Sequence, residues 1–323
     1  MDDRLQRYRD AGLKAVRFQL GYQQPDGGYV WEGYARDAFH KQAYSWALAG
    51  AVEPAHRLLT WVKENRLQAD GQLSEYGGDC YKHSWFFQGA HRLSRFDLSY
   101  PVMGFLKSCM APCGGLPHFA GDPYCRSLAT CCTGLSALTY GDLPMAERIA
   151  AWAIRMLEGQ PEESRFYFRT TLDGTLVTPA VSEKDALCID VTKPKQDHWE
   201  VGLPLQLMCR LYQATGREEW LGYAKRFFEF TLRSHDDAYG WAGSGKSALG
   251  AALTYLCTGD RRARQCACAF CDFLLETQYP EGGWRDETEP DTILIYIDHA
   301  AEFNIWLHEI SSLIPGADVR WGA

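Results

Sequence analysis

The sequence has no long apolar run and no excess of basic charge. None of its apolar runs reaches 18 residues, which excludes a typical membrane-spanning helix. The formal net charge of −8 disfavours nucleic acid and an anionic membrane as partners. The first residues have neither the basic region nor the apolar stretch of a signal peptide, so we expect a cytoplasmic protein. A small molecule is therefore the expected partner, and the sequence is also compatible with a homo-oligomer.

Cysteine is plentiful, but its placement does not indicate a disulfide-rich domain. The chain has 12 cysteines. Many lie inside apolar helix patterns, among them Cys131, Cys132, Cys209, Cys257, Cys266 and Cys268. Buried free thiols act there as small hydrophobic side chains. We therefore expect every cysteine to be reduced.

Six glycine-centred turns divide the chain at regular intervals. The first glycine of each turn is Gly27, Gly71, Gly114, Gly174, Gly240 and Gly282. The steps between them are 44, 43, 60, 66 and 42 residues, which is the range of a helical-hairpin repeat. This spacing predicts one supersecondary unit used six times.

Two kinds of helix pattern alternate around these turns. One set has a single apolar face, as expected for helices with one side in water, and covers about 2–24, 54–67, 96–110, 143–160, 218–233 and 260–278. The other set is apolar or small nearly all round, as in buried helices, and covers about 36–50, 81–94, 122–140, 198–215, 245–258 and 291–314. The alternation predicts an all-α (α/α)6 barrel, or α/α toroid, with six outer and six inner helices in a single domain over residues 1–323.

The connections give this barrel a functional end. Links from inner to outer helices are short, whereas links from outer to inner helices are longer and carry the glycine turns. The longest covers about 161–197, and its alternating pattern predicts a small β-hairpin near 166–178. Long loops on one rim are usually functional. We expect the site at this rim, covered by a lid-like insertion at 161–197.

Two of the turns resemble a motif of a known superfamily. Residues 277–284 read Thr-Gln-Tyr-Pro-Glu-Gly-Gly-Trp, and residues 23–29 read Gln-Gln-Pro-Asp-Gly-Gly-Tyr. Both are similar to the glutamine–tryptophan repeat of the triterpene (squalene) cyclases and protein prenyltransferases, which are α/α toroids. In that superfamily the glutamine ties a helix end to the next turn, and the aromatic ring packs between repeats. The resemblance implies the fold more than an activity.

The catalytic motifs of that superfamily are mostly missing. The Asp-x-Asp-Asp string of the triterpene cyclases does not occur, so the resemblance implies a divergent member with one barrel. Prenyltransferases bind zinc through an Asp-x-Cys pair and a later histidine, and the nearest equivalents are Asp122, Cys125 and His299. The Asp–Cys spacing is longer by one residue. Asp122 as a helix cap and Cys125 as a core residue is the alternative that we favour. We expect no metal and no cofactor.

One phosphate-binding pattern is present in an unsuitable context. Residues 240–247 match G-x-x-x-x-G-K-[ST]. That chemistry requires a buried strand before the loop, and the preceding 233–239 segment is polar. We therefore do not assign nucleotide binding, although Lys246 stays a candidate for contact with another anion.

Titratable and aromatic residues gather where the inner helices begin. We predict His83 and His198 as the leading acid–base residues, because each begins a buried helix beside aromatic side chains that would lower the histidine pKa. Asp37, Asp79 and Glu200 would orient the histidines or the substrate. The predicted substrate-binding residues are His40, Tyr81, Trp85, His118, Tyr124, Trp199, Trp241, Lys246, Trp284, Tyr296 and His299. The same rim contains Lys41, Arg126, Asp298 and Glu302, to which we assign no role.

Three functions fit this pattern. The first, which we favour, is an acid–base isomerase, cyclase or lyase that resembles terpenoid cyclases and acts on a hydrophobic small molecule. The second is a carbohydrate-active enzyme, since paired carboxylates and aromatic platforms suit a glycoside hydrolase, lyase or epimerase equally well. The third is a binding scaffold without chemistry. The concentration of histidine and carboxylate at one rim disfavours the scaffold.

Overall fold

The computed structural model describes residues 3–28, 39–284 and 293–314, which are mostly helical. The chain divides into two compact units. Unit 1 comprises Met1–Ser108 and Cys271–Ser311, and unit 2 comprises Cys109–Phe270 and Ser312–Ala323. The expectation of a single domain over residues 1–323 stays a prediction.

Unit 1 is built from helices at the two ends of the chain. They are α1 (Asp3–Leu20), α2 (Gln42–Leu48), α3 (Val52–Asn65), α4 (Cys80–Arg92), α5 (Phe96–Ser108), the last part of α11 (Arg261–Thr277) and nearly all of α12 (Ile293–Leu313). Helix α4 packs against both α2 and α5, and α2 also packs against α3. The inner helix predicted at 36–50 is shorter in the structure: α2 begins at Gln42, residues 39–41 form a turn before it, and 29–38 lie outside the described residues.

The two helix classes differ in burial as the sequence predicts. On α3 the buried side chains form one stripe, with Leu58, Leu59 and Val62 among them. On α4 ten of the 13 residues are buried. A helix with one buried stripe faces solvent on its other side, whereas a helix buried all round lies in the interior. The distinction between outer and inner helices is thus confirmed for these two.

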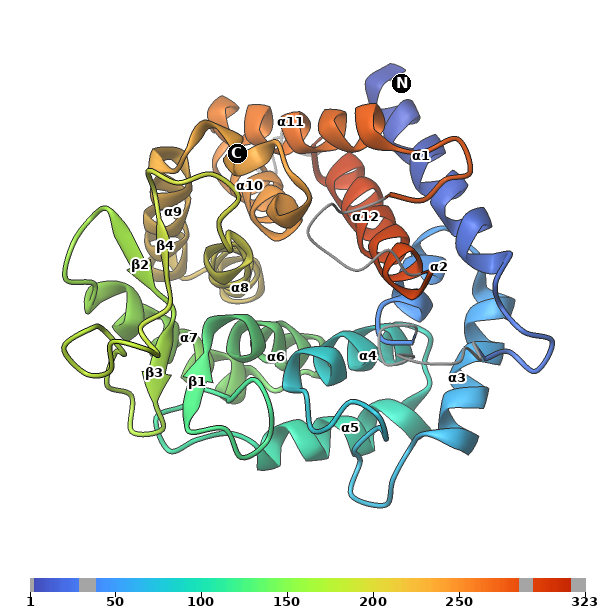
Figure 1. Cartoon of the computed structure of the whole chain (residues 1–323), viewed down its shortest axis with the longest axis horizontal. Helices are drawn as coiled ribbons and strands as arrows, with labels where there is room; N and C mark the ends of the chain where they lie inside the picture. The colour runs from blue at the N-terminus through green and yellow to red at the C-terminus, as the bar shows by residue number, and fades with distance from the viewer. Residues whose placement is uncertain (1–2, 29–38, 285–292, 315–323) are drawn as a thin grey trace. The chain divides into compact units, whose positions relative to one another are not determined.

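The described residues of unit 2 form five complete helices and two 3-10 turns. They are α6 (Ser127–Tyr140), α7 (Leu143–Glu158), α8 (Trp199–Thr215), α9 (Glu218–Arg233), α10 (Gly245–Thr258), η1 (Asp236–Tyr239) and η2 (Ala242–Ser244). Helix α8 packs against α6, α9 and α10 (Figure 1). A Cβ at Gly202 would lie 2.4 Å from the Ser247 nitrogen, so the absence of a side chain lets α8 approach α10 closely.

Two short antiparallel ladders form the β structure of unit 2 within the described residues. Strand β1 (Tyr124–Arg126) pairs with β3 (Arg169–Thr171), and β2 (Arg165–Tyr167) pairs with β4 (Cys188–Asp190) (Figure 1). The chain does turn back at Asp173-Gly174, where Thr170 bridges Leu176, as the predicted hairpin requires. The regular ladders, however, pair β3 with β1 and β2 with β4, so the two arms of the predicted hairpin do not form a ladder with each other. The helix predicted from 122 begins at Ser127, because 124–126 are taken up by β1.

The two glutamine turns have the structural role that the resemblance implies. Gln278 donates from Nε2 to the carbonyl oxygens of Gly282 and of Ala11 in α1. Gln23 likewise donates to the carbonyl oxygens of Gly27 and of Pro54 in α3. Each glutamine therefore closes its own turn and ties it to a helix distant in sequence. Gly282 has φ +110°, and a Cβ there would lie 2.6 Å from the Lys14 carbonyl oxygen, so the turn depends on glycine.

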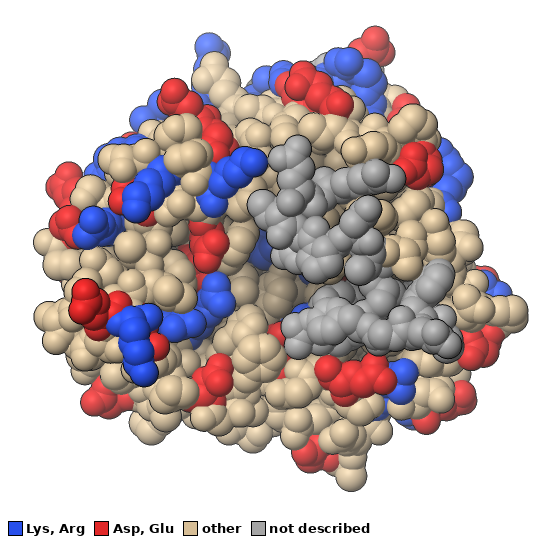
Figure 2. All heavy atoms as spheres, in the orientation of Figure 1, with Lys and Arg blue, Asp and Glu red and all other residues tan. Residues whose placement is uncertain are grey.

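The distribution of surface charge and the hydropathy of the helices bear on the partners expected from composition. Figure 2 shows acidic and basic side chains interspersed over the visible face, with no large field of one sign. Among the described residues, no helix is both long enough and apolar enough to cross a membrane.

Candidate active site

A buried lysine lies between two carboxylates in unit 1. Lys41 immediately precedes α2, and Asp298 and Glu302 lie four residues apart on α12, so both carboxylates share one face of that helix. Lys41 Nζ is 2.7 Å from Asp298 Oδ2 and 2.5 Å from Glu302 Oε2. The Lys41 side chain is only 4% exposed. This triad of side chains, called here the Lys41 centre, joins the start of an inner helix to the last helix of the fold.

Lys41 and Asp298 hold each other in the ionised state. Burial opposes the ammonium form, but the charges of Asp298 and Glu302 outweigh it and raise the pKa of Lys41. Burial likewise opposes the Asp298 carboxylate, yet Lys41 and His40 lower the pKa of Asp298 below its ordinary value. His40 Nε2 lies 3.5 Å from Asp298 Oδ1. At neutral pH the centre thus contains an ionised, mostly buried Asp298.

Aromatic rings surround the Lys41 centre. The ammonium group of Lys41 lies 5.9 Å from the centroid of the Tyr81 ring. Tyr81 packs edge-on against Trp85, and Trp85 against Trp306, with centroids 6.3 and 5.6 Å apart. Trp306 in turn donates from Nε1 to Glu302 Oε1 at 3.3 Å. The predicted substrate-binding residues His40, Tyr81 and Trp85 are therefore brought together beside charged groups.

Several buried polar atoms near this centre make no hydrogen bond to the described part of the chain. They are Asp298 Oδ1, His299 Nδ1, Tyr76 Oη and Trp85 Nε1. The rings of Tyr76 and Tyr81 both pack near His40, at 6.2 and 6.3 Å, which places Tyr76 at the same locality. Buried polar atoms are usually satisfied, so several unsatisfied ones in one locality mark a place where water or a ligand would supply the partners.

The geometry gives His83 and Asp79 structural roles. His83 is fully buried, its Nε2 accepts a hydrogen bond from the Leu73 nitrogen at 2.9 Å, and its Nδ1 lies 2.6 Å from the Asp79 carbonyl oxygen. Burial lowers the pKa of His83 to about 4, so the ring is neutral with its proton on Nδ1. The Asp79 carboxylate caps α4 by accepting a hydrogen bond from the backbone nitrogen of Lys82. Both nitrogens of His83 are thus used by the backbone, and we assign no proton transfer to it.

In unit 2, Glu200 forms the centre of a second polar cluster. Arg126 Nε lies 2.6 Å from Glu200 Oε1, and the Leu128 nitrogen donates to Oε2 at 2.7 Å. Burial raises the pKa of Glu200, although Arg126 opposes the shift. Arg126 also lies 3.6 Å from Asp197, whose pKa burial raises against the same opposing charge.

His198 differs from His83 because one of its nitrogens is uncommitted. Its buried Nε2 has no hydrogen-bond partner among the described residues, and burial lowers its pKa to about 4. The indole nitrogens of Trp199 and Trp241 are likewise buried and unpartnered, and their rings lie 6.0 Å apart. His198 thus keeps a free ring nitrogen, and the next residue in sequence belongs to the tryptophan pair. His83 belongs to unit 1 and His198 to unit 2, so their pairing as acid and base stays a prediction.

The remaining predicted site residues are distributed over both units. In unit 1, Trp284 is buried and donates to the Leu274 carbonyl oxygen, Tyr296 lies half-buried on α12, and His299 stacks on Phe303. In unit 2, His118 packs against Phe119, Tyr124 donates to Asp185 at 3.0 Å, and Lys246 is buried at the start of α10. Asp37 lies outside the described residues.

The alternative zinc ligands are not collected into one site within either unit. Asp122 accepts a hydrogen bond from the Phe119 nitrogen in its own turn, and Cys125 Sγ lies 3.9 Å from Cys113 Sγ. His299 belongs to unit 1, whereas the other two belong to unit 2. Over the described ranges, no group of three His, Cys, Asp or Glu side chains could hold a metal ion.

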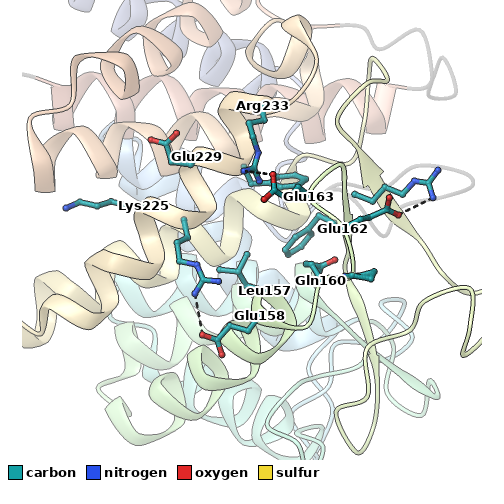
Figure 3. Close-up of a pocket in the computed structure, with 13 residues that line it drawn as sticks. Leu157, Glu158, Gln160, Glu162, Glu163, Lys225, Glu229 and Arg233 are labelled. Atoms are coloured by element: carbon teal, nitrogen blue, oxygen red, sulfur yellow. Dashed lines mark hydrogen bonds and ion pairs between the residues drawn. The ribbon is translucent and has the colours of Figure 1, made fainter.

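A separate surface groove of about 530 Å³ lies in unit 2 between the end of α7, β2 and α9. Its charged side chains are exposed and largely paired, as between Arg226 and Glu158 and between Arg165 and Glu162 (Figure 3). It contains none of the predicted site residues. Exposed pairs of this kind contribute little to stability and are common on surfaces, so the groove is a weaker candidate than the buried clusters.

Comparisons with known proteins identify the fold. No family model and no curated protein matches the sequence. Among solved structures, an inactive variant of the GH76A α-1,6-mannanase of Salegentibacter sp. HEL1_6, in complex with α-1,6-mannotetrose, is 12% identical, with a TM-score of 0.67 over 95% of this chain and 99% of that chain. The crystal structure of D-mannose isomerase is 12% identical, with a TM-score of 0.66 over 94% and 97% of the two chains.

A third similar structure is a type II terpene cyclase. A variant of MstE from Scytonema, in complex with its substrate geranylgeranyl dihydroxybenzoate, is 14% identical, with a TM-score of 0.64 over 97% of this chain and 100% of that chain. At such low identity the likeness extends to the fold alone. Together with the mostly helical architecture, it confirms that this chain has the all-α fold of the (α/α)6 toroids.

Proposed function

We propose that this protein is an enzyme that performs acid–base catalysis on a small molecule at the Lys41 centre. The observation that carries the proposal is the state of Asp298. Its carboxylate is ionised and mostly buried, and one of its two oxygens accepts no hydrogen bond from the described residues. A mostly buried, ionised carboxylate with one oxygen that accepts no hydrogen bond can take a proton from a bound substrate.

The neighbouring groups complete this assignment. Lys41 binds Oδ2 of Asp298, which leaves Oδ1 directed to a different partner. The ammonium charge keeps Asp298 ionised at neutral pH and favours negative charge that develops on a substrate nearby. His40, whose Nε2 lies 3.5 Å from Oδ1, and His299, whose Nδ1 is unpartnered, are the candidates to return the proton.

This chemistry fits a hydroxylated, carbohydrate-like substrate best. Charged oxygen and nitrogen atoms bind hydroxyl groups, and the aromatic rings of Tyr81 and Trp85 lie beside them, as in many sugar-binding sites. An ionised carboxylate removes protons and does not supply them, so Asp298 suits isomerisation, epimerisation or elimination. Similarity in fold to D-mannose isomerase and to an α-1,6-mannanase supports this choice over the terpenoid substrate favoured by the sequence.

A cyclase or isomerase acting on a hydrophobic terpenoid is the second candidate, and unit 2 favours it. Protonation of an alkene requires an acid that carries its proton. Burial raises the pKa of Asp197, and the next residue, His198, has a free Nε2. The indole rings of Trp199 and Trp241 would suit an apolar, cationic intermediate.

A substrate panel in deuterated water tests both candidates. The full chain would be incubated separately with mono- and oligosaccharides and with geranylgeranyl dihydroxybenzoate, and the products followed by proton NMR and mass spectrometry. We expect conversion of a saccharide with deuterium incorporated at carbon. Conversion of the prenylated compound alone would select the second candidate. No turnover of either class would contradict both.

Matched variants assign the reaction to the Lys41 centre. Asp298→Asn should lower turnover about 10²- to 10⁴-fold, the usual loss for a general base. Asp272→Asn is the control, because Asp272 is another unit 1 carboxylate that binds Tyr8 at 2.7 Å, and we expect it to keep the native rate. Equal rates for native protein and Asp298→Asn would refute the role of Asp298.

A further inference from the structure

Two arginines lie directly opposite each other on the ladder between β1 and β3. The register pairs Arg126 with Arg169 and Tyr124 with Thr171. Residues paired across an antiparallel ladder lie on the same face with their Cβ atoms about 4.5–5.5 Å apart. The other face carries Cys125 and Thr170, which are buried in the core of unit 2. The arginine pair therefore lies on the less buried face of the ladder.

This arrangement is unfavourable for the protein alone. Like charges placed directly opposite each other destabilise a ladder. Burial, with the Arg126 charge acting in the same direction, lowers the pKa of Arg169 below its ordinary value. Arg126 is balanced by the fully buried Glu200, at 2.6 Å, and lies 3.6 Å from Asp197. Arg169 has no such balance.

The guanidinium group of Arg169 makes no hydrogen bond or ion pair with the described residues. The carboxylates whose charges act on it are Asp185, Glu200 and Asp122. Each is engaged elsewhere: Asp185 by Tyr124 and Ser182, Glu200 by Arg126 and Leu128, and Asp122 by the Phe119 nitrogen. A half-buried guanidinium with five donors and no acceptor among the described residues is available to a partner from solution.

We propose that Arg169, with Arg126 beside it, binds an oxyanion, a carboxylate or phosphate group carried by a small molecule, in unit 2. The planar guanidinium fork matches the oxygen pair of either group, and a bound anion supplies the counter-charge that the ladder lacks. The inference depends only on residues of unit 2. It holds or fails independently of the reaction assigned to the Lys41 centre.

Anion-dependent stability of the full chain tests the site. The melting temperature would be followed against increasing inorganic phosphate or succinate at constant ionic strength. Native protein should show a saturable rise, since a ligand that binds only the folded state stabilises it. Arg169→Gln should weaken the apparent affinity about ten- to hundredfold, the effect of losing a charge-assisted hydrogen bond. Because phosphate also stabilises proteins by exclusion from their surface, the difference between native and variant is the readout.

Arg165→Gln is the matched control. Arg165 begins the neighbouring strand β2, is 44% exposed, and pairs with Glu162 and Asp190. Its variant should respond to the anion as native protein does. A response to phosphate alone would identify a phosphate ester as the ligand type, a response to succinate alone a carboxylate, and a response to both an oxyanion of either kind. Identical curves for native protein and Arg169→Gln would overturn the proposal.

Stability without the anion provides a second readout. Arg169→Gln removes one of two facing like charges and breaks no contact with a charged partner in the described ranges, so it should melt at the native temperature or above it. A residue kept for binding at the expense of stability has this signature. A lower melting temperature, with the anion response unchanged, would show that Arg169 is structural.

Discussion

Lys41 Nζ and Asp298 Oδ2 lie 2.7 Å apart although the two residues are separated by 257 positions in the sequence. The contact joins the segment before α2 to helix α12 in the interior of unit 1. A buried ion pair contributes little net stability, because desolvation offsets the attraction, but removing one partner leaves an uncompensated charge. The pair is therefore a weak explanation of stability, which agrees with the catalytic role that we propose for it.

Replacing Lys41 should destabilise the protein substantially. Lys41→Met leaves Asp298 and Glu302 buried without their counter-charge, and breaking a buried pair in this way costs about 3–5 kcal/mol. The free energy of unfolding from urea titration measures the loss. Lys63→Met is the control, because Lys63 pairs with Asp97 at the surface and such pairs contribute about 0–1 kcal/mol. Similar losses for the two variants would show that the Lys41 pair is not effectively buried.

Acid should destabilise the protein between pH 6.5 and pH 4 through its buried histidines. Burial lowers the pKa of His83 and of His198 from 6.5 to about 4. Below pH 6.5 the unfolded chain binds these protons and the folded chain does not. The stability they contribute is complete above pH 6.5 and is lost as the pH falls towards 4, on the order of 3 kcal/mol for each histidine.

The comparison of His83→Gln with native protein isolates this effect. The free energy of unfolding would be measured at pH 7 and pH 4.5 for both. The loss between the two pH values should be smaller in the variant, whatever the substitution costs at pH 7. The same loss in both proteins would mean that His83 is protonated in the folded state at pH 4.5.

Gln278 should stabilise the last glycine turn. Gln278→Ala removes both hydrogen bonds to the carbonyl oxygens of Ala11 and Gly282, and we expect a loss of about 1–3 kcal/mol in thermal or urea unfolding. The exposed Gln68, for whose side chain no hydrogen bond is described, provides the control variant Gln68→Ala, with an expected change within about 0.5 kcal/mol. Equal effects of the two substitutions would show that the hydrogen bonds of Gln278 do not stabilise the turn.

All 12 cysteines are free thiols in the structure. Thiol titration under denaturing, non-reducing conditions should therefore recover 12 per chain. Cys113 and Cys125, with sulfur atoms 3.9 Å apart, are the pair to inspect if fewer are found. Recovery of ten would indicate one disulfide and contradict the reduced state.

Helix positions could be predicted well because each helix carries its own periodic signal. The outer helix predicted at 218–233 and the inner helix predicted at 245–258 have those bounds in the structure. The segment 122–126 was predicted as helix and is partly a strand. Three residues are too few to show an alternating pattern, and their partner, 169–171, lies more than 40 residues later.

The candidate site could be predicted only in part. The sequence places His40, Tyr81 and Trp85 near the same rim, but it does not reveal that Lys41 meets Asp298 and Glu302. Their spacing of four on α12 puts both carboxylates on one face, and that was the available signal. That Lys41 is the partner of these carboxylates depends on a tertiary contact between residues 257 positions apart, which the local sequence does not show. For the same reason the backbone partners of His83 could not be foreseen.

The most direct test of the account is a crystal structure of Asp298→Asn with a saccharide substrate bound. The variant keeps the shape of the side chain and removes the base, so the complex should persist. We expect a substrate hydroxyl within about 2.6–3.2 Å of the side chain at position 298, or the reacting carbon within about 3–3.5 Å, with Tyr81 or Trp85 near the ring. A substrate that contacts none of Lys41, Asp298 and Glu302 would contradict the assignment of the active site.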